Sequence, residues 1–278
     1  MLRKVTILIL GLALLSGCSK QYAAEKDFYR ASRYSADIFK DPKIIPPYKF
    51  EKALEDFTAI IDKYPGTPQA IEAHFIAGNI CMLQHKYPEA SVFFRKIKKD
   101  YPAQVELQAR ATISLAACLE QENNWPEAYR NYREAVEKYP EVPAILQVPI
   151  YLLDHYIKGG DKTKEEQVYH LAVRDYQVVI SKYPKTKSAY SARNMLAEVY
   201  MRHGDWADVL VTLNELLKQY PQSPDAPTWL MTMAATYETK LHNNGKAREY
   251  YQLLKDKYSG SPWAREAGKR LVSLEVPK

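Results

Sequence analysis

The sequence is short of cysteine, of charge of one sign and of long apolar runs. It has three cysteines, so that besides Cys18 only Cys81 and Cys118 could form an internal disulfide. A formal charge of +6 over 278 residues, spread along the chain, is too small to indicate a protein that binds nucleic acid. After residue 15 no apolar run is long enough to span a bilayer.

Motifs for catalysis and for metal binding are missing as well. The sequence has no H-E-x-x-H, no Cys/His cluster with metal-ligand spacing, no G-x-S-x-G and no Gly-rich phosphate loop. We therefore expect the chain not to be an enzyme and to bind no metal. Cys81 and Cys118 lie among apolar residues, so we expect buried thiols, although an oxidising compartment would also permit a disulfide.

What the chain does contain is one helical unit, repeated. The unit is clearest at residues 86–102, KYPEASVFFRKIKKDYP, where an aromatic residue and a proline start a helix and Tyr101-Pro102 ends it. Ala90 and Phe94 share one face of this helix, and lysines occupy its last turn. The unit ends six times, with spacings of 37, 38, 44, 37 and 38 residues, at Tyr64, Tyr101, Tyr139, Tyr183, Tyr220 and Tyr258.

A small residue precedes a large one by four positions in every copy. The six pairs are Ala53/Phe57, Ala90/Phe94, Ala128/Tyr132, Ala172/Tyr176, Val209/Leu213 and Ala247/Tyr251. Aromatic residues such as Trp125 and Trp206 stand three positions earlier and either anchor the start of the helix or form a ladder that stacks on a ligand. His85, His203 and His242 each lie in the turn before this helix in their own repeat. A metal-binding or pH-sensitive edge of the array is therefore an open possibility.

A second amphipathic segment precedes the unit, clearest over residues 73–83, 111–119 and 193–201. Gly78, Ala116 and Ala197 stand where a small side chain lets two helices approach closely. Together, these features resemble the tetratricopeptide repeat over about residues 22–274. The usual period of that family is ~34 residues, and the additional residues of each copy here lie in the connector after the tyrosine. The resemblance implies an all-α solenoid, a right-handed superhelix of about six helix pairs plus a capping helix at 262–274.

Two repeats depart from the pattern. In repeat one, a predicted helix over residues 23–39 is followed by DPKIIPPY at 41–48, whose three prolines should prevent a helix. In repeat four, Pro149 should kink or delay the first helix, Gly159-Gly160 should end it, and a long second helix should cover 163–182. We expect an N-terminal block at 23–140 and a C-terminal block at 141–278, joined at repeat four.

The N-terminus resembles a bacterial lipoprotein signal. Arg3 and Lys4 precede an apolar run at 5–15, and Leu15-Ser16-Gly17-Cys18 resembles the lipobox. This resemblance implies a signal peptide at 1–17 and a lipidated tether at 18–22. Cys18 would carry diacylglycerol and a further acyl chain such as palmitate. Two or more acyl chains attach a protein stably to a membrane. An ordinary secretory signal with an incidental cysteine is the alternative.

Repeat style and lipobox together are similar to the outer-membrane β-barrel assembly (BamD-like) lipoproteins. That resemblance implies a scaffold on the cell outer membrane, facing the periplasm, that binds envelope proteins and has no cofactor beyond the lipid. In such superhelices the first helices line a groove that binds peptides. By position, the groove residues would be Glu72, Phe75, Asn79, Met82, Leu83, Arg110, Ile113, Glu120, Gln121, Asn194, Glu198, Met201 and Arg202.

Two alternatives to this interpretation stay open at the level of sequence. The groove residues could instead be buried between neighbouring helices. The chain could also be a glycan- or peptidoglycan-binding surface lipoprotein that stacks sugars on Trp125 and Trp206.

Overall fold

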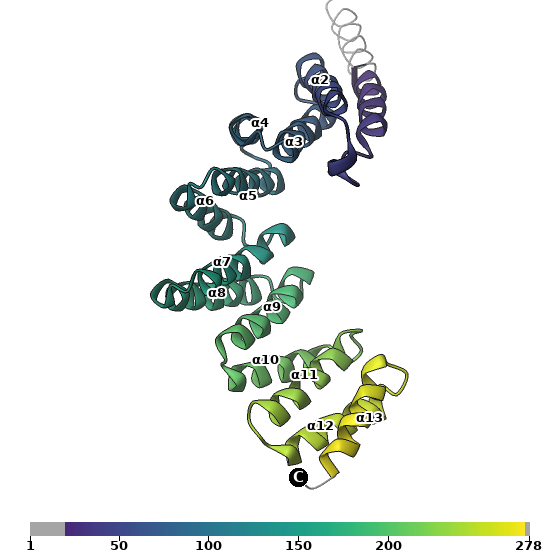
Figure 1. Ribbon diagram of the computed structural model, residues 1–278, viewed down its shortest axis with the longest axis vertical. Helices are drawn as coiled ribbons and strands as arrows, with labels where there is room; N and C mark the ends of the chain where they lie inside the picture. Colours follow the sequence, from purple (N-terminus) through teal and green to yellow (C-terminus); the bar gives the residue numbers. More distant parts are fainter. Residues whose placement is uncertain (1–19, 276–278) are drawn as a thin grey trace, which may run out of the picture. The chain divides into compact units, whose positions relative to one another are not determined.

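The computed structural model describes residues 20–275, which form helices and turns without a strand (Figure 1). The predicted signal peptide and Cys18 lie outside the described residues. The chain divides into two compact units, unit 1 up to Tyr139 and unit 2 from Pro140 onward. Each unit contains helices that pack against their neighbours in sequence.

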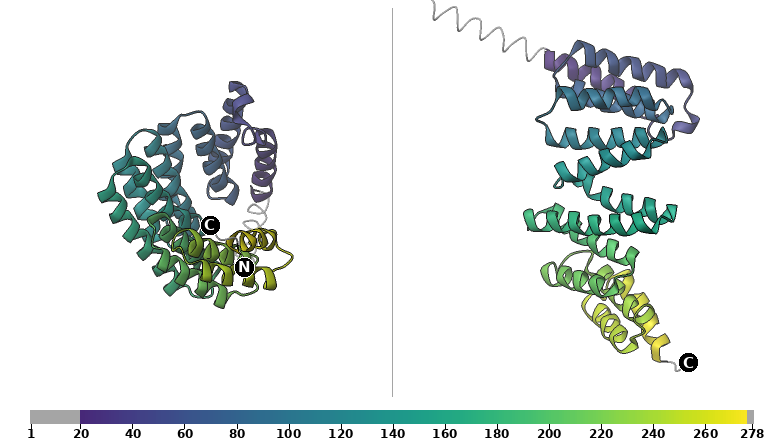
Figure 2. Two further views of the ribbon diagram at one scale, coloured as in Figure 1. Left: turned by 60° about the horizontal axis from the view of Figure 1, so that its bottom comes forward. Right: turned by 90° about the vertical axis from the view of Figure 1, so that its left-hand side faces the viewer.

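The described part of unit 1 starts with a helix over residues 20–35, which we call the 20–35 helix. It is followed by the 3-10 helix η1 (Pro42–Ile44) and by α2 (Pro47–Lys63), α3 (Pro68–Leu83), α4 (Tyr87–Asp100), α5 (Val105–Gln121) and α6 (Trp125–Lys138). Figure 2 shows the 20–35 helix beside α2 and α3, in agreement with an edge-to-face contact of Phe28 with Phe57 and a hydrogen bond of 3.0 Å from Gln21 to Gln69.

Unit 2 contains one more 3-10 helix and seven α-helices among its described residues. They are η2 (Pro143–Gln147), α7 (Val148–Gly159), α8 (Lys162–Lys182), α9 (Lys187–His203), α10 (Trp206–Gln219), α11 (Ala226–Thr239), α12 (Asn244–Lys257) and α13 (Pro262–Glu275).

The predicted tyrosine ends are confirmed at all six places. Each second helix stops at its tyrosine, whose φ lies between −131° and −122° and whose ψ lies between 42° and 58°. A following proline disfavours helical geometry, yet Tyr258, which precedes Ser259, ends its helix in the same way. Three of these tyrosines also donate a hydrogen bond from their hydroxyl to a group earlier in the chain, to Asp27, to Glu141 and to the carbonyl of Pro221.

The six small and large pairs lie in the buried seams between helices. Every member is at most 6% exposed, and most are fully buried. At Gly78 a Cβ atom would lie 2.7 Å from Cζ of Phe94, closer than packed atoms approach one another. The small residue of the first helix is therefore required because the large residue of the next helix lies against its backbone.

Three details at the N-terminus of unit 1 differ from the sequence prediction. Residues 20–22, assigned to the tether, are helical, and this helix ends at residue 35 rather than 39. There the amide of Ile38 donates to the carbonyl of Ser35, a tighter turn that brings the fully buried Ile38 into the core. The prediction that 41–48 cannot be helical was wrong in two places. Pro42–Ile44 form the 3-10 helix η1, and Pro47 fits the first turn of α2 and costs it no hydrogen bond.

Repeat four follows its prediction closely. Helix α7 starts late, at Val148, with Pro149 in its first turn and η2 ahead of it. Gly160 ends α7 in the left-handed conformation with φ of 72°, which glycine adopts without strain. Helix α8 is 21 residues long, so the added residues extend this helix.

Candidate partner-binding sites

Unit 1 has a hollow between α3 and α5, which we call the α3–α5 hollow. Its volume is about 590 Å³, and it is lined by Pro42, Lys43, Met82, Leu83, His85, Tyr87, Ala117 and Gln121. Met82, Leu83 and Gln121 are among the groove residues that the sequence predicts. The remaining lining comes mainly from η1 and the α3–α4 turn.

The rim of the α3–α5 hollow is polar and held in place. His85 lies in the left-handed region with φ of 59°, and its Nδ1 is 2.7 Å from the hydroxyl of Tyr87. That hydroxyl donates in turn to Oε1 of Gln121 at 3.4 Å. A partner would meet apolar Met82 and Leu83 inside and an ordered set of hydrogen-bonding groups at the edge.

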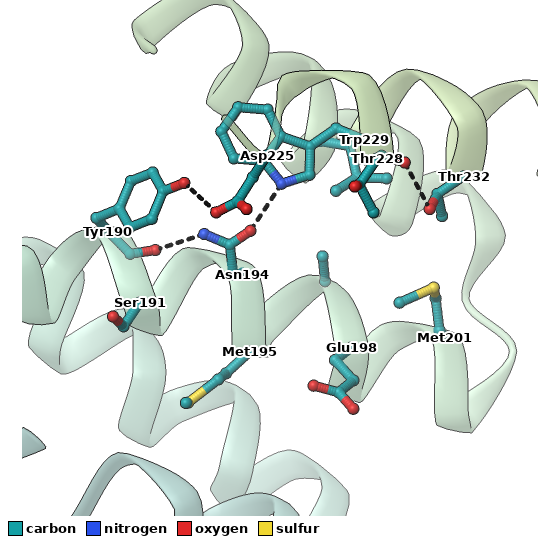
Figure 3. A pocket seen from close by; sticks show the side chains of 12 residues that line it. Tyr190, Ser191, Asn194, Met195, Glu198, Met201, Asp225, Thr228, Trp229 and Thr232 are labelled. Carbon is teal, nitrogen blue, oxygen red and sulfur yellow. Dashed lines mark hydrogen bonds between the residues drawn. The ribbon is translucent and has the colours of Figure 1, made fainter. Parts of the chain in front are cut away.

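Unit 2 has a comparable hollow between α9 and α11, the α9–α11 hollow (Figure 3). Its volume is about 470 Å³. Figure 3 shows Asn194 and Glu198 on one helix opposite Trp229 on the other. Thr228, Thr232 and the thioethers of Met195 and Met201 also line the hollow.

Asn194 holds the two walls of this hollow together. Its Nδ2 donates to the carbonyl of Tyr190 at 3.0 Å, and its Oδ1 accepts from Nε1 of Trp229 at 2.7 Å. The hydroxyl of Tyr190 donates to Oδ2 of Asp225 at 2.5 Å. Burial and this carboxylate raise the pKa of Tyr190, so the hydroxyl stays a donor. Both polar atoms of the Asn194 amide are therefore engaged in hydrogen bonds, one of which joins α9 to α11, and the same side chain lines the hollow.

The prediction that Phe75 lines the groove was wrong, and the alternative of burial between neighbouring helices holds for this residue. Phe75 is 2% exposed, and its ring centroid lies 6.2 Å from that of Phe94 and 4.1 Å from the guanidinium carbon of Arg110. Arg110 also pairs with Glu72 at 3.4 Å. Phe75 is therefore a core residue beneath an ion pair, because its helix turns it toward α4 rather than into the hollow.

The other predicted groove residues lie outside both hollows. Asn79 is exposed, and Ile113 and Glu120 are half-buried, with Glu120 accepting from the hydroxyl of Tyr132 at 3.0 Å. Arg202 bridges Asp154 and Glu198, each at 2.7 Å. The sequence analysis missed Tyr190, Trp229 and Asp225. Extending the same periodicity to residues 226–239 would have pointed to Thr228 and Thr232.

The two tryptophans proposed as stacking platforms take part in packing. Trp125 is half-buried, with ring centroids 6.2 Å from Tyr129 and 6.4 Å from Tyr132. Nζ of Lys240 lies 5.0 Å above the ring of Trp206. These contacts fit the interpretation that the aromatic residues anchor the start of their helices, and they do not favour the glycan-binding alternative.

Cys81 and Cys118 are buried free thiols, as predicted. Burial raises the pKa of Cys81 to about 11 and also raises the pKa of Cys118. Thiols that stay protonated are poor nucleophiles. Among residues 20–275, no group of His, Cys, Asp and Glu side chains could hold a metal ion.

A polar cluster joins α8 to the α9–α10 turn. Nδ1 of His203 lies 2.9 Å from Oδ2 of Asp205, and its Nε2 lies 3.0 Å from Oε2 of Glu166. Tyr169 stacks on His203 at 3.7 Å and donates to Asp205, while His170 pairs with Glu166 at 2.9 Å. Burial alone would lower the pKa of His203, but Glu166 and Asp205 outweigh it and raise that pKa.

We expect this cluster to make the stability of unit 2 depend on pH. The raised pKa of His203 contributes stability that is complete below the unfolded value of about 6.5 and is lost as pH rises through the folded pKa. The pKa values of Glu166 and Asp205 are lowered, so their contribution is lost as pH falls toward about 4. His203→Gln should therefore lower the urea midpoint more at about pH 6 than at about pH 9. His242→Gln, in an exposed turn, is the control, and an equal loss at both pH values would contradict the linkage.

Residues 195–223 match the tetratricopeptide repeat family. This segment contains the end of α9, all of α10 and the Tyr220-Pro221 connector, and so corresponds to one small-residue crossing and one second helix. The fold of the described residues is all-α and of the tetratricopeptide type. No curated protein matches the chain.

Several solved structures are similar to the chain at low identity. A tetratricopeptide repeat protein from Parabacteroides merdae is 15% identical, with 91% of this chain and 95% of that chain covered and a TM-score of 0.44. BtubC (BKLC) from P. vanneervenii is 16% identical, with 86% and 92% covered and a TM-score of 0.44. Within residues 20–275 no helix has the length and apolar character needed to cross a membrane.

Proposed function

We propose that the chain is a lipid-anchored scaffold at the cell outer membrane, facing the periplasm, that binds protein partners of an envelope or outer-membrane assembly complex. Tetratricopeptide-type arrays are scaffolds for protein–protein interaction, and they are generally not catalytic. The observation that carries the binding role is the pair of hollows. In each, two first helices (α3 and α5, or α9 and α11) present half-buried apolar side chains beside fixed polar groups.

The chemistry of the hollows suits a peptide segment of a partner protein. Met82, Met195 and Met201 are flexible and polarisable, so they adapt to apolar side chains of different shapes. Tyr87 and Thr228 supply hydroxyls that could bind the backbone of an extended or helical segment. Openings of this volume fit several side chains of such a segment.

The lipid anchor is supported by sequence alone. Leu15-Ser16-Gly17-Cys18 has the small residues and the cysteine where a lipobox requires them, and Ser19 in place of Asp favours the outer membrane. The proposed lipid is covalent, and no other cofactor is proposed. The partner would then be a protein of the envelope, held beside the membrane by the acyl chains.

Photocrosslinking in intact cells tests the binding role. A photoreactive residue at position 121 in the α3–α5 hollow, or at position 228 in the α9–α11 hollow, should capture a defined membrane-associated protein. Met82→Asp and Met201→Asp should each lower capture at their own hollow by about tenfold or more, because a carboxylate would be desolvated against apolar groups of the partner.

Val92→Asp on α4 and Val211→Asp on α10 are the matched controls, since both valines are more than half exposed and line neither hollow. Circular dichroism should show the same helix content in all four variants. Capture that survives both methionine substitutions, or that falls equally in the valine controls, would contradict binding through the hollows.

A further inference from the structure

The outer face of the 20–35 helix has a composition unlike that of a solvated helix. Tyr22, Lys26, Tyr29 and Arg33 are spaced by four, three and four residues and so share one side. Tyr22 is 69% exposed and Tyr29 is 63% exposed, and both basic residues are exposed. We call these four residues the aromatic–basic stripe.

The opposite side of the same helix is the one that belongs to the core. Ala24 is fully buried, Ala31 is 3% exposed and Ser35 is 2% exposed. Phe28 packs on Phe57 of α2, with ring centroids 5.9 Å apart. The stripe therefore faces away from the core of unit 1, and the exposure of its four side chains shows that no other described segment covers it.

The charge of the stripe is not neutralised by its surroundings. Within residues 20–275, Lys26 and Arg33 have no carboxylate within ion-pair distance, and the guanidinium of Arg33 lies 5.9 Å from the ring centroid of Tyr29. The carboxylate of the nearby Asp27 accepts hydrogen bonds from Nζ of Lys63 at 3.2 Å and from the hydroxyl of Tyr64 at 2.6 Å. The stripe thus presents two cations and two aromatic rings.

The position of Cys18 indicates what binds to the aromatic–basic stripe. One residue, Ser19, separates Cys18 from residue 20, so the Cα atoms of residues 18 and 20 are at most about 7 Å apart. A diacylglyceryl group on Cys18 would place the start of the helix at the level of the lipid headgroups. Tyrosine fits this boundary because its ring is apolar and its hydroxyl polar. Lysine and arginine are attracted to anionic headgroups.

We propose that the aromatic–basic stripe lies on an anionic lipid surface and forms a second, non-covalent attachment beside the acyl anchor. This inference rests on the proposed lipidation of Cys18 for its geometry. Two attachments along one helix would hold unit 1 in a single orientation to the membrane, whereas an acyl anchor alone would let it rotate. The tether keeps the local lipid concentration high, so the stripe needs only weak intrinsic affinity.

Vesicle binding of the unacylated chain tests the stripe separately from lipidation. The mature chain from residue 18 with Cys18→Ser should co-sediment with phosphatidylglycerol-containing vesicles at low salt and not with phosphatidylcholine vesicles. Lys26→Gln/Arg33→Gln should lower the bound fraction by about tenfold or more, since each basic side chain near an anionic surface contributes roughly a factor of five. Tyr22→Ser/Tyr29→Ser should lower it as well.

Matched controls remove the same groups elsewhere on unit 1. Lys96→Gln/Lys99→Gln takes two exposed charges from α4, and Tyr48→Ser/Val92→Ser takes two exposed apolar side chains. Binding should survive in both controls. Equal losses in the control and stripe variants would overturn the proposal, because binding would then depend on charge or apolar surface in general.

A second measurement uses the acylated protein. A spin label at Lys26→Cys in vesicle-bound lipoprotein should report the depth of the headgroups, while a label at Lys96→Cys should report water. The native Cys81 and Cys118 are buried and should not compete for the label. Water-like exposure at both positions would overturn the proposal while leaving lipidation intact, and so would protection of position 26 only when a protein partner is added.

Discussion

Phe94→Ala should lower the free energy of unfolding by about 3–5 kcal/mol, the range found when a buried phenylalanine ring is removed. The ring of Phe94 is fully buried, and it fills the space over Gly78 where a Cβ would come within 2.7 Å. Its truncation would leave a cavity between α3 and α4 that neither helix can close without moving. Urea unfolding followed by circular dichroism measures the loss.

Val92→Ala on the same helix is the control, with an expected change within about 0.5 kcal/mol because Val92 is 61% exposed. Gly78→Ala adds a second check. It should destabilise the wild-type protein through its clash with Phe94 and be tolerated better beside Phe94→Ala, where the ring is gone. A Phe94→Ala variant within about 1 kcal/mol of wild type would show that the seam does not carry the stability of the array.

Cys18→Ser should abolish incorporation of labelled palmitate completely, because the sulfur that would accept diacylglycerol is lost. The wild-type chain should be labelled and should lack residues 1–17, whereas the variant should keep them, since the lipobox resemblance implies cleavage only before a lipidated cysteine. Metabolic labelling and mass spectrometry of the N-terminal peptide measure both effects.

Ser16→Ala changes a neighbouring small residue of the lipobox and should leave the label in place, which makes it the matched control. A Cys18→Ser chain that is still processed and still fractionates as before would identify an ordinary secretory signal with an incidental cysteine. That result would contradict the proposed lipidation of Cys18, while the two hollows would remain candidate binding sites.

The repeats could be predicted from the sequence because their signals are local. The spacing of Ala90 and Phe94 within one helix, and the turn at Tyr101-Pro102, follow from helical period and proline sterics over a few residues. The same holds for Gly160, whose left-handed conformation ends α7 where the glycine pair predicted it. Such features recur in phase along the chain, and each copy supports the others.

The hollows could be predicted only in part, because they depend on how helices are rotated against one another. Met82 and Phe75 both lie on apolar positions of α3, yet Met82 lines a hollow and Phe75 is buried beneath Arg110. Lys43 and His85 reach the α3–α5 hollow from connecting segments, whose positions are set by packing. The early end of the 20–35 helix likewise follows from the burial of Ile38 in the core.

The shared backbone geometry of the six tyrosine ends has a consequence for how such a chain can change length. At each of these tyrosines the backbone leaves the second helix with nearly the same φ and ψ. Excising residues 65–101 would join Tyr64 to Pro102 and recreate the original dipeptide at the splice. Gene duplication or loss could thus add or remove whole modules without inventing a new connection.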